Sequence, residues 1–244
     1  MRDVRQTSFF LDLYLSNNTL DLYYIRRTIL TAIQENLDKF HGTFLDLGCG
    51  DMPYKPLLLS EKTKVKQYIG IDIASGKIDY DVKPDYFWDG NVIPLADESV
   101  DCVMSTEVFE HCPDLLSVMK EIKRVLKPGG FVFFTVPFLW PLHEAPYDEF
   151  RYTPYSLERI IRNAGFDRVL LKPTGGWNES MGQMLGLWVT RSPMNFHVRR
   201  VLKLLLRPFI WWLVRKKKQR KEFVFEDLMM ITGISGLAYK PQDR

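Results

Sequence analysis

The stretch "TFLDLGCGDMPY", residues 43–54, places Gly48 and Gly50 directly after a short apolar run. The run "TFLDL" is typical of a short buried strand, and the two glycines predict a tight turn at its carboxyl end. A ligand can approach such a backbone closely, because glycine has no side chain to exclude it. The turn is either a binding loop or a simple structural turn, and the residues around it must decide between them.

Two common phosphate-binding patterns do not fit this loop. The dinucleotide fingerprint needs a third glycine where Pro53 stands, and the Gly-Lys-Ser/Thr ending of a phosphate-binding loop is absent. The next buried run, "QYIGIDI" at residues 67–73, ends beside Asp72, which would be placed to accept hydrogen bonds from two ribose hydroxyls. A solvated acidic residue at a strand end is the alternative interpretation of Asp72.

The rest of the chain alternates helical patterns with apolar runs. Apolar residues at helical spacing predict helices at residues 20–38, 115–126 and 156–166. Further strands are predicted at residues 100–106, 131–136, 168–173 and 234–241. Gly42 and "KPGG" (127–130) are interpreted as helix stops. Strands that alternate with helices predict an α/β domain with a mainly parallel sheet.

Composition excludes several classes of protein. The 244 residues suit one well-buried domain with additions, and a net charge of +3 does not by itself indicate nucleic acid. The three cysteines give neither a disulfide framework nor a zinc pattern, and the amino-terminal stretch does not resemble a secretory signal, so a cytoplasmic protein with reduced thiols is expected. No metal is expected either, because the histidines are widely spaced: His41, His111, His143 and His197.

Six motifs in order resemble class I S-adenosylmethionine-dependent methyltransferases, of the broad group similar to small-molecule methyltransferases. The matching stretches are "LDLGCG" (45–50), "GIDI" (70–73), Asp89 to Leu95, "DESVD" (97–101), "EVFEH" (107–111) and "RVLKPGG" (124–130). The resemblance implies a Rossmann-like fold: a seven-stranded, mostly parallel sheet with helices on both faces. It also implies S-adenosylmethionine as the methyl donor, with no metal.

The resemblance assigns a role to each matching position. The loop around the methionine part of the donor would be formed by Asp46, Gly48, Cys49 and Gly50. Asp72 would bind the ribose, and Ile73 would pack on the adenine. Asp89 and Gly90 would contact the adenine edge. Ser105 would lie at the end of the fourth strand, near the sulfonium.

The acceptor is expected in the proline-punctuated stretch "VPFLWPLHEAPYDEFRYTPYSL", residues 136–157, because it leaves the carboxyl edge of the sheet. His143 is the candidate base for a hydroxyl acceptor, because a histidine beside carboxylates can be poised near neutral pH. His111 is the rival base, with a structural role as its alternative. Arg151 would bind an anionic substrate group, and Asp148 would orient His143 or hold sugar hydroxyls.

The other candidate substrate-binding residues in this stretch are Glu144, Tyr147 and Tyr152. In the alternative interpretation the stretch is a structural lid, in which Asp148 and Arg151 pair with each other. Its pattern H-x-x-P-x-D-x-x-R-Y-T also resembles methyltransferases found with bacterial surface-glycan enzymes.

The segment "RRVLKLLLRPFIWWLVRKKKQRK", residues 199–221, mixes basic residues with leucine and tryptophan and has no acidic residue. Its apolar run from Phe209 to Val214 is much shorter than the ~20 residues of a membrane span, and Pro208 predicts a bend or a restart of the helix. The pattern favours a helix lying on an anionic membrane surface. Packing on the domain or in a dimer interface is the alternative, and nucleic acid is not expected.

We expect one methyltransferase domain over residues 1–244. Its expected parts are a helical cap (1–41), a donor-binding core (43–137), an acceptor side (138–175), a basic and aromatic helical insertion (176–226), and a last strand with a tail (227–244). The expected reaction is O-methylation of a sugar or lipid-linked glycan at the inner membrane face. The alternatives are a soluble methyltransferase acting on a quinone-like or other metabolite, and a non-catalytic binding protein of the same fold.

Overall fold

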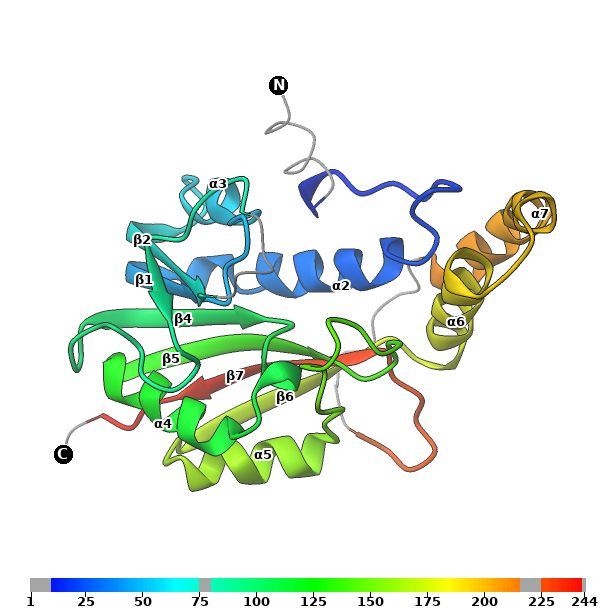
Figure 1. Cartoon of the computed structure of the whole chain (residues 1–244). Coiled ribbons are helices and arrows are strands. Elements are labelled where there is room, and N and C mark those ends of the chain that lie inside the picture. Colours follow the sequence, from blue (N-terminus) through cyan, green and yellow to red (C-terminus); the bar gives the residue numbers. More distant parts are fainter. Residues whose placement is uncertain (1–9, 75–79, 216–224, 243–244) are drawn as a thin grey trace.

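The computed structural model describes residues 10–74, 80–215 and 225–242 (Figure 1). Its centre is a seven-stranded sheet in the order β3-β2-β1-β4-β5-β7-β6. The strands are β1 (His41–Leu47), β2 (Lys64–Ile73), β3 (Tyr86–Trp88), β4 (Val100–Thr106), β5 (Leu126–Pro137), β6 (Arg168–Thr174) and β7 (Gly233–Tyr239). Only β7 runs antiparallel to its neighbours in this sheet. The predicted Rossmann-like, mostly parallel sheet is confirmed.

Helices cover both faces of the sheet, as predicted (Figure 1). On one face lie α2 (Tyr23–Gln34), the 3-10 turn η1 (Leu37–Lys39) and the short α3 (Lys55–Leu58); on the other lie η2 (Phe109–His111), α4 (Leu115–Val125) and α5 (Pro154–Asn163). The apolar residues along one side of α4 are all buried: Leu115, Val118, Met119, Ile122 and Val125. Each face of the sheet therefore has its own apolar core.

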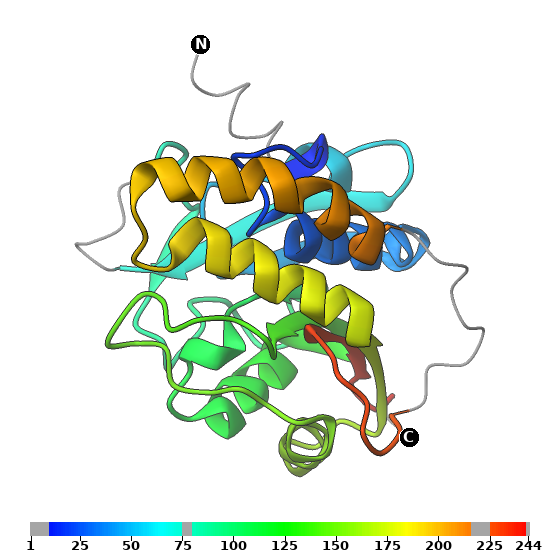
Figure 2. The same ribbon diagram turned by 90° about the vertical axis from the view of Figure 1, so that its right-hand side faces the viewer.

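Beyond the carboxyl ends of the parallel strands stand α6 (Trp177–Arg191) and α7 (Phe196–Val214), which lie side by side (Figures 1 and 2). Glycines let α6 approach its neighbours. A Cβ at Gly182 would lie 2.6 Å from Val214, and one at Gly186 would lie 2.2 Å from the carbonyl oxygen of Leu20. The hairpin is therefore fitted closely to the segment that precedes α2.

Several predicted boundaries are wrong. The first helix ends at Gln34, and Gly42 lies inside β1. Glycine is needed there, because its φ is +62° and a Cβ would collide with the side chain of Asp101. The Asp101 carboxylate lies so close because it accepts a hydrogen bond from the amide of Thr43. "KPGG" belongs to β5, where it forms an irregularity opposite β4. The helix α7 continues through Pro208. The elements α3 and β3 were not predicted from the sequence, and α6 lies within the predicted helical insertion at residues 176–226.

None of the helices in the described ranges combines the length and the apolar character needed to cross a lipid bilayer.

Candidate active site

The glycine loop after β1 is built from two glycines with different tasks. Gly48 and Gly50 have φ values of +76° and +51°, in the left-handed region that favours glycine. A Cβ at Gly48 would lie 2.2 Å from Cγ2 of Val108, so Gly48 allows the loop to pack against the segment after β4. A Cβ at Gly50 would meet no atom within 4 Å. The backbone at Gly50 therefore borders open space, as a ligand-binding loop requires.

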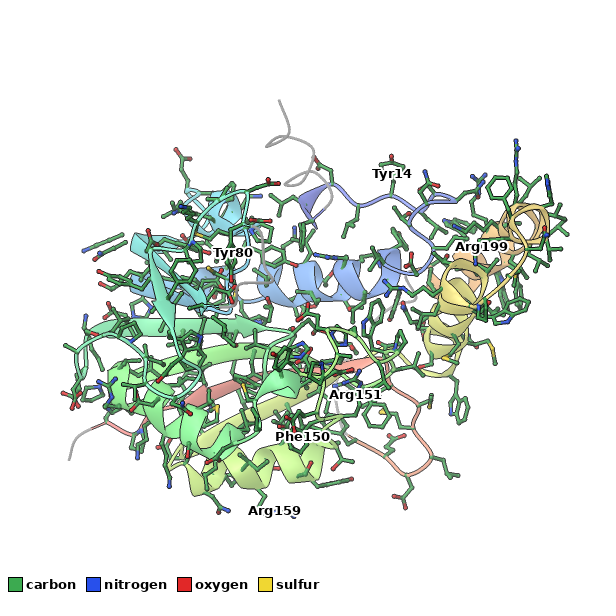
Figure 3. The ribbon with its side chains drawn as sticks, viewed as in Figure 1. Tyr14, Tyr80, Phe150, Arg151, Arg159 and Arg199 are labelled. Carbon is green, nitrogen blue, oxygen red and sulfur yellow. The ribbon has the colours of Figure 1, made fainter. Side chains whose placement is uncertain are left out.

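Asp72 joins this loop to the end of β2. Its carboxylate accepts hydrogen bonds from the amides of Gly50 at 2.6 Å and Ile73 at 2.7 Å. Burial raises the pKa of Asp72, against these hydrogen bonds, which favour the ionised form. The side chain of Ile73 is 40% exposed and is available to pack on a flat ring. Tyr80 lies beside this strand end, where its hydroxyl donates to the carbonyl of Ile73 (Figure 3).

Asp89 and Gly90 follow β3, the strand that sequence reasoning missed. Because β3 pairs with the end of β2, it brings these two residues next to Ile73. Asp89 is exposed and accepts the amides of Asn91 and Val92, which lower its pKa. Gly90 has a φ of +86° and open space where a Cβ would stand. The implied adenine-side residues are thus gathered at one edge of the sheet.

Asp46, Cys49 and Ser105 lie beneath the loop. Asp46 is 2% exposed and accepts a hydrogen bond from the hydroxyl of Tyr68, and burial raises its pKa to about 7. Burial also raises the pKa of the Cys49 thiol, which disfavours a nucleophilic thiolate. Ser105 is fully buried and donates to the carbonyl of Leu47 at 3.1 Å. It lies near the end of β4, as predicted, and its hydroxyl supports the glycine loop.

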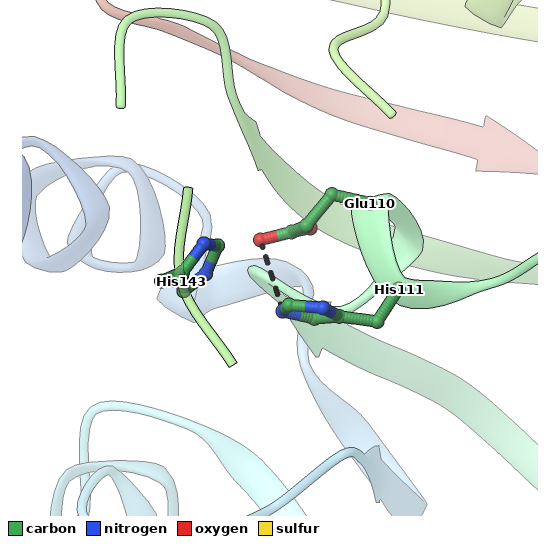
Figure 4. A group of neighbouring side chains, drawn as sticks. All are labelled: Glu110, His111 and His143. Atoms are coloured by element: carbon green, nitrogen blue, oxygen red, sulfur yellow. Dashed lines mark ion pairs between the residues drawn. The ribbon is translucent and has the colours of Figure 1, made fainter. Parts of the chain in front are cut away.

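The two candidate bases meet in one cluster beyond β4 and β5 (Figure 4). The ring centroids of His111 and His143 are 4.9 Å apart. Nδ1 of His111 is 3.0 Å from the carbonyl oxygen of Tyr147, and its Nε2 is 3.8 Å from carboxylate oxygens of Glu110 and Glu144. His111 and His143 are therefore close in space although they are far apart in the sequence, so their spacing in the sequence was not a valid argument against a shared site.

Asp148 positions His143, as one of its predicted roles required. It accepts the backbone amide of His143 at 3.1 Å and lies 3.1 Å from Nδ1 of the ring. Arg151 donates to both oxygens of Asp148, at 2.6 and 2.8 Å, and holds the pKa of that carboxyl well below its usual range (Figure 3). The pairing of Asp148 with Arg151, foreseen as the alternative, is thus present.

This pairing corrects two predicted substrate contacts. The side chain of Asp148 is 2% exposed, so it is not available to hold sugar hydroxyls. The Arg151 guanidinium also donates to the carbonyls of Trp140, Pro141 and Phe150. Its hydrogen-bond donors therefore bind groups of the same loop instead of a substrate anion.

Tyr152 is also corrected, because it is buried and its hydroxyl donates to the carbonyl of Phe109. It supports η2 from below. Glu144 and Tyr147, by contrast, are largely exposed in the same loop and stay candidates for substrate contact.

Sequence reasoning missed two carboxyl groups inside the motif "EVFEH". Burial raises the pKa of Glu107 to about 7, although Arg26 and Arg151 favour its ionised form. Glu110 is fully buried, and burial together with Glu107 raises its pKa well above the usual range. The available signal was their position: two acidic residues directly after a buried strand, at the edge where ligands bind.

Comparison with known proteins agrees with this geometry. Residues 45–134 match the family model described as "Methyltransferase domain". A malonyl-[acyl-carrier protein] O-methyltransferase of Yersinia pestis is 36% identical over 98 residues, covering 37% of this chain and 35% of the relative. A ubiquinone biosynthesis O-methyltransferase of Bordetella pertussis is 32% identical over 131 residues, covering 47% and 51%. The chain thus spans between a third and about half of the length of these relatives.

Solved structures extend the likeness beyond the matched domain. The crystal structure of a "SAM dependent methyltransferase" from Archaeoglobus fulgidus superimposes with a TM-score of 0.54 at 18% identity, covering 88% of this chain and 94% of that one. At this level of identity the likeness concerns the fold. The sheet order, the glycine loop and the family match together lead to one conclusion: the chain has a Rossmann-like methyltransferase fold, and its residues 45–134 match the model of a methyltransferase domain.

Proposed function

We propose that this protein is an S-adenosylmethionine-dependent methyltransferase. The observation that carries the proposal is Asp72, whose carboxylate is fixed at the end of β2 by the amides of Gly50 and Ile73. This arrangement suits a ribose, because a fixed carboxylate can accept two hydroxyl groups. The open side of Gly50 leaves room for the methionine part of the donor. The family match and the named activities of the relatives support the same proposal.

The acceptor we propose is a hydroxyl group of a sugar or lipid-linked glycan. Methyl transfer to a hydroxyl breaks the bond from the methyl carbon to sulfur, forms a carbon–oxygen bond and releases the hydroxyl proton. His143 would take that proton, because Asp148 holds its ring in place. Alignment and exclusion of water would supply much of the remaining rate.

A soluble small-molecule acceptor is the second candidate. Two relatives are named as O-methyltransferases of a protein-bound malonyl group and in ubiquinone biosynthesis, and neither name mentions a sugar. A labelled methyl group distinguishes the candidates: incorporation into lipid-linked glycan supports the first, and incorporation only into soluble acids or phenols supports the second.

A membrane surface is the partner we propose for α7. Large apolar side chains on its outer face are about half exposed or more: Val201, Leu204, Leu205, Trp211 and Trp212. Arg200 and Arg207 are exposed beside them, as an interfacial helix requires. The basic residues that follow in sequence lie outside the described residues: Lys216, Lys217, Lys218, Arg220 and Lys221.

Calorimetric titration with S-adenosylmethionine and S-adenosylhomocysteine tests the donor. We expect micromolar binding of both, and at least about tenfold weaker binding in Asp72→Ala, which loses the ribose contact. Asp85→Ala is the matched control, because Asp85 also accepts a backbone amide, that of Gly70, on the same strand. Equal donor affinity in wild type and Asp72→Ala would remove the ribose assignment. A folded wild type that binds neither compound would favour the non-catalytic alternative.

A further inference from the structure

We propose that Glu110, His111 and His143 bind one divalent transition-metal ion (Figure 4). Each residue offers one ligand atom, and these three atoms lie within 4.8 Å of one another. Nε2 of His111 is 3.8 Å from Oε1 of Glu110. Two ligands of a tetrahedral ion with bonds near 2.1 Å are about 3.4 Å apart. Small side-chain rotations would therefore close this cluster around an ion.

The state of Glu110 is the second observation. The residue is fully buried, and neither carboxylate oxygen has a hydrogen-bond partner among the described residues. Burying a carboxyl group without a partner is costly, so such groups are normally paired, protonated or bound to a metal. Two imidazole rings stand next to it, and a second carboxylate, that of Glu144, lies 3.8 Å from Nε2 of His111; all of these are metal-ligand groups. A cation in this place would stabilise the ionised carboxylate of Glu110, which burial alone disfavours.

The ring of His111 is already held by its other nitrogen, and that of His143 lies close to a carboxylate. Nδ1 of His111 is 3.0 Å from the carbonyl oxygen of Tyr147. Nδ1 of His143 is 3.1 Å from Asp148, which Arg151 fixes in turn. Histidines that bind metals commonly pair their second nitrogen with a carboxylate or a carbonyl, which fixes the tautomer and the ring orientation. Nε2 of His111 is thereby left for a ligand, and within the described part of the chain His143 makes no hydrogen bond at Nδ1, although that atom lies near Asp148.

The ligand set indicates the kind of ion. Two imidazoles and one carboxylate suit Zn²⁺, Mn²⁺, Fe²⁺ or Co²⁺ better than Mg²⁺ or Ca²⁺, which prefer oxygen ligands alone. Three protein ligands also leave at least one position open. Val108, which packs against the donor loop at Gly48, lies in the same short segment as Glu110 and His111. The cluster therefore adjoins a segment that contacts the donor loop. The base role proposed for His143 belongs to the metal-free protein: with an ion bound, His143 would be a ligand, and an acceptor hydroxyl at the open position would be acidified by the ion.

The test uses the full chain without an affinity tag, freed of metal with a chelator. Titration with Zn²⁺ is followed by calorimetry, and bound metal is counted by mass spectrometry after dialysis. We expect one ion per chain with micromolar or tighter affinity. Co²⁺ should give the visible absorption of a low-symmetry site without a thiolate charge-transfer band, because the three ligands of the cluster include no cysteine.

Variants locate the site. Glu110→Gln keeps the shape of the side chain and removes its charge, and we expect it and His143→Ala to weaken Zn²⁺ binding at least about tenfold. His197→Ala, in an exposed histidine on α7, is the control and should bind as wild type. If Glu110→Gln does not fold, His111→Ala gives the same test.

Two outcomes would overturn the proposal: wild type that takes up no stoichiometric metal, or binding that survives in every cluster variant. Titration of the metal-free protein with S-adenosylmethionine separates this site from the proposed activity. Metal binding without donor binding would leave the site standing and the proposed function refuted.

Discussion

Asp46 is the residue whose environment makes the clearest prediction about pH. Burial raises its pKa in the folded protein to about 7, well above its value of about 3.9 in an unfolded chain. Between these values the folded state binds more protons, so the free energy of unfolding falls as pH rises from about 4 to about 7. Asp46→Asn keeps a hydrogen-bond acceptor for Tyr68 but does not titrate. When the pH rises from 5 to 7.5, we expect its free energy of unfolding to increase by about 2 kcal/mol relative to that of wild type.

Urea unfolding at these two pH values measures this difference. Asp85→Asn is the control, because Asp85 is exposed and its substitution should change the two stabilities about equally. A difference between Asp46→Asn and wild type that is the same at both pH values would show that Asp46 is ionised throughout.

His143 makes the prediction about catalysis. With the proposed acceptor hydroxyl, His143→Ala should lower kcat by about 10²–10⁴-fold, because proton transfer to a positioned base is lost. Affinity for S-adenosylmethionine should change little, since His143 lies on the acceptor side. Steady-state kinetics with a labelled methyl group, together with calorimetry, separate the two effects. An unchanged kcat would exclude His143 as the base, and His197→Ala serves as the control.

At this scale, local motifs predicted the positions of the candidate donor residues better than those of the candidate acceptor residues. Asp72, Ile73 and Gly50 lie on short turns at strand ends, where sequence position fixes spatial position. Glu110 and His143 meet only because η2 and the loop after β5 converge. No local pattern encodes such a contact. The burial of Tyr152 could not be predicted from the sequence either, because tyrosine occurs both in buried cores and in exposed binding sites.

The element that depends most on a single residue is α6. A Cβ at Gly186 would lie 2.2 Å from the carbonyl oxygen of Leu20, a backbone atom that cannot rotate away. We expect Gly186→Ala to destabilise the protein by about 1–3 kcal/mol, although alanine favours an isolated helix. Gly176→Ala, at the helix start, is the control, because its nearest neighbour is the flexible end of Glu179 at 3.2 Å. Thermal unfolding of both variants tests this, and equal stability would mean that α6 can shift.

Pairing with a neighbouring strand, which is not visible in a local sequence pattern, determines the parts of the sheet that were predicted wrongly. β3 is three residues long and two of them are exposed, so it has no apolar run and exists only through its pairing with β2. "KPGG" contains the residues that stop helices, and it does follow α4 directly. It is nevertheless part of β5, because the strand continues past an irregularity in its pairing with β4. Propensity predicted the end of the helix correctly and the start of the strand wrongly.

On the scale of the whole molecule, hydrophobic patterning predicted the sheet but not what stands at its edge. Buried runs identified six of the strands, and the helices between them required parallel pairing. The placement of α6 and α7 beyond the carboxyl edge depends on glycine contacts and on bonds to Asp21, which accepts from Gln183 and Arg191. Arg191 also lies over the Trp140 ring, so the hairpin touches the loop that carries His143.

This arrangement makes the membrane prediction one about the whole molecule. The helix α7, which carries the exposed apolar side chains, and the loop that carries His143 lie at the same end of the protein (Figures 1 and 2). If that face rests on anionic lipid, a lipid-linked acceptor can reach the site without leaving the bilayer surface. We expect the double variant Leu204→Ser, Trp211→Ser to bind anionic vesicles about tenfold or more weakly, because two large apolar groups are lost from the lipid contact.

Vesicle sedimentation measures this binding, with neutral vesicles alongside. Both residues are more than half exposed, so the fold should persist, and Tyr155→Ser on α5 removes an equally exposed aromatic group far from α7. The double variant should also lose activity on a lipid-linked acceptor while keeping its affinity for the donor. If the wild-type protein does not bind anionic vesicles, the exposed face of α7 would instead be assigned to a protein contact. That result would also favour the soluble acceptor, because nothing would then place the site at a bilayer surface.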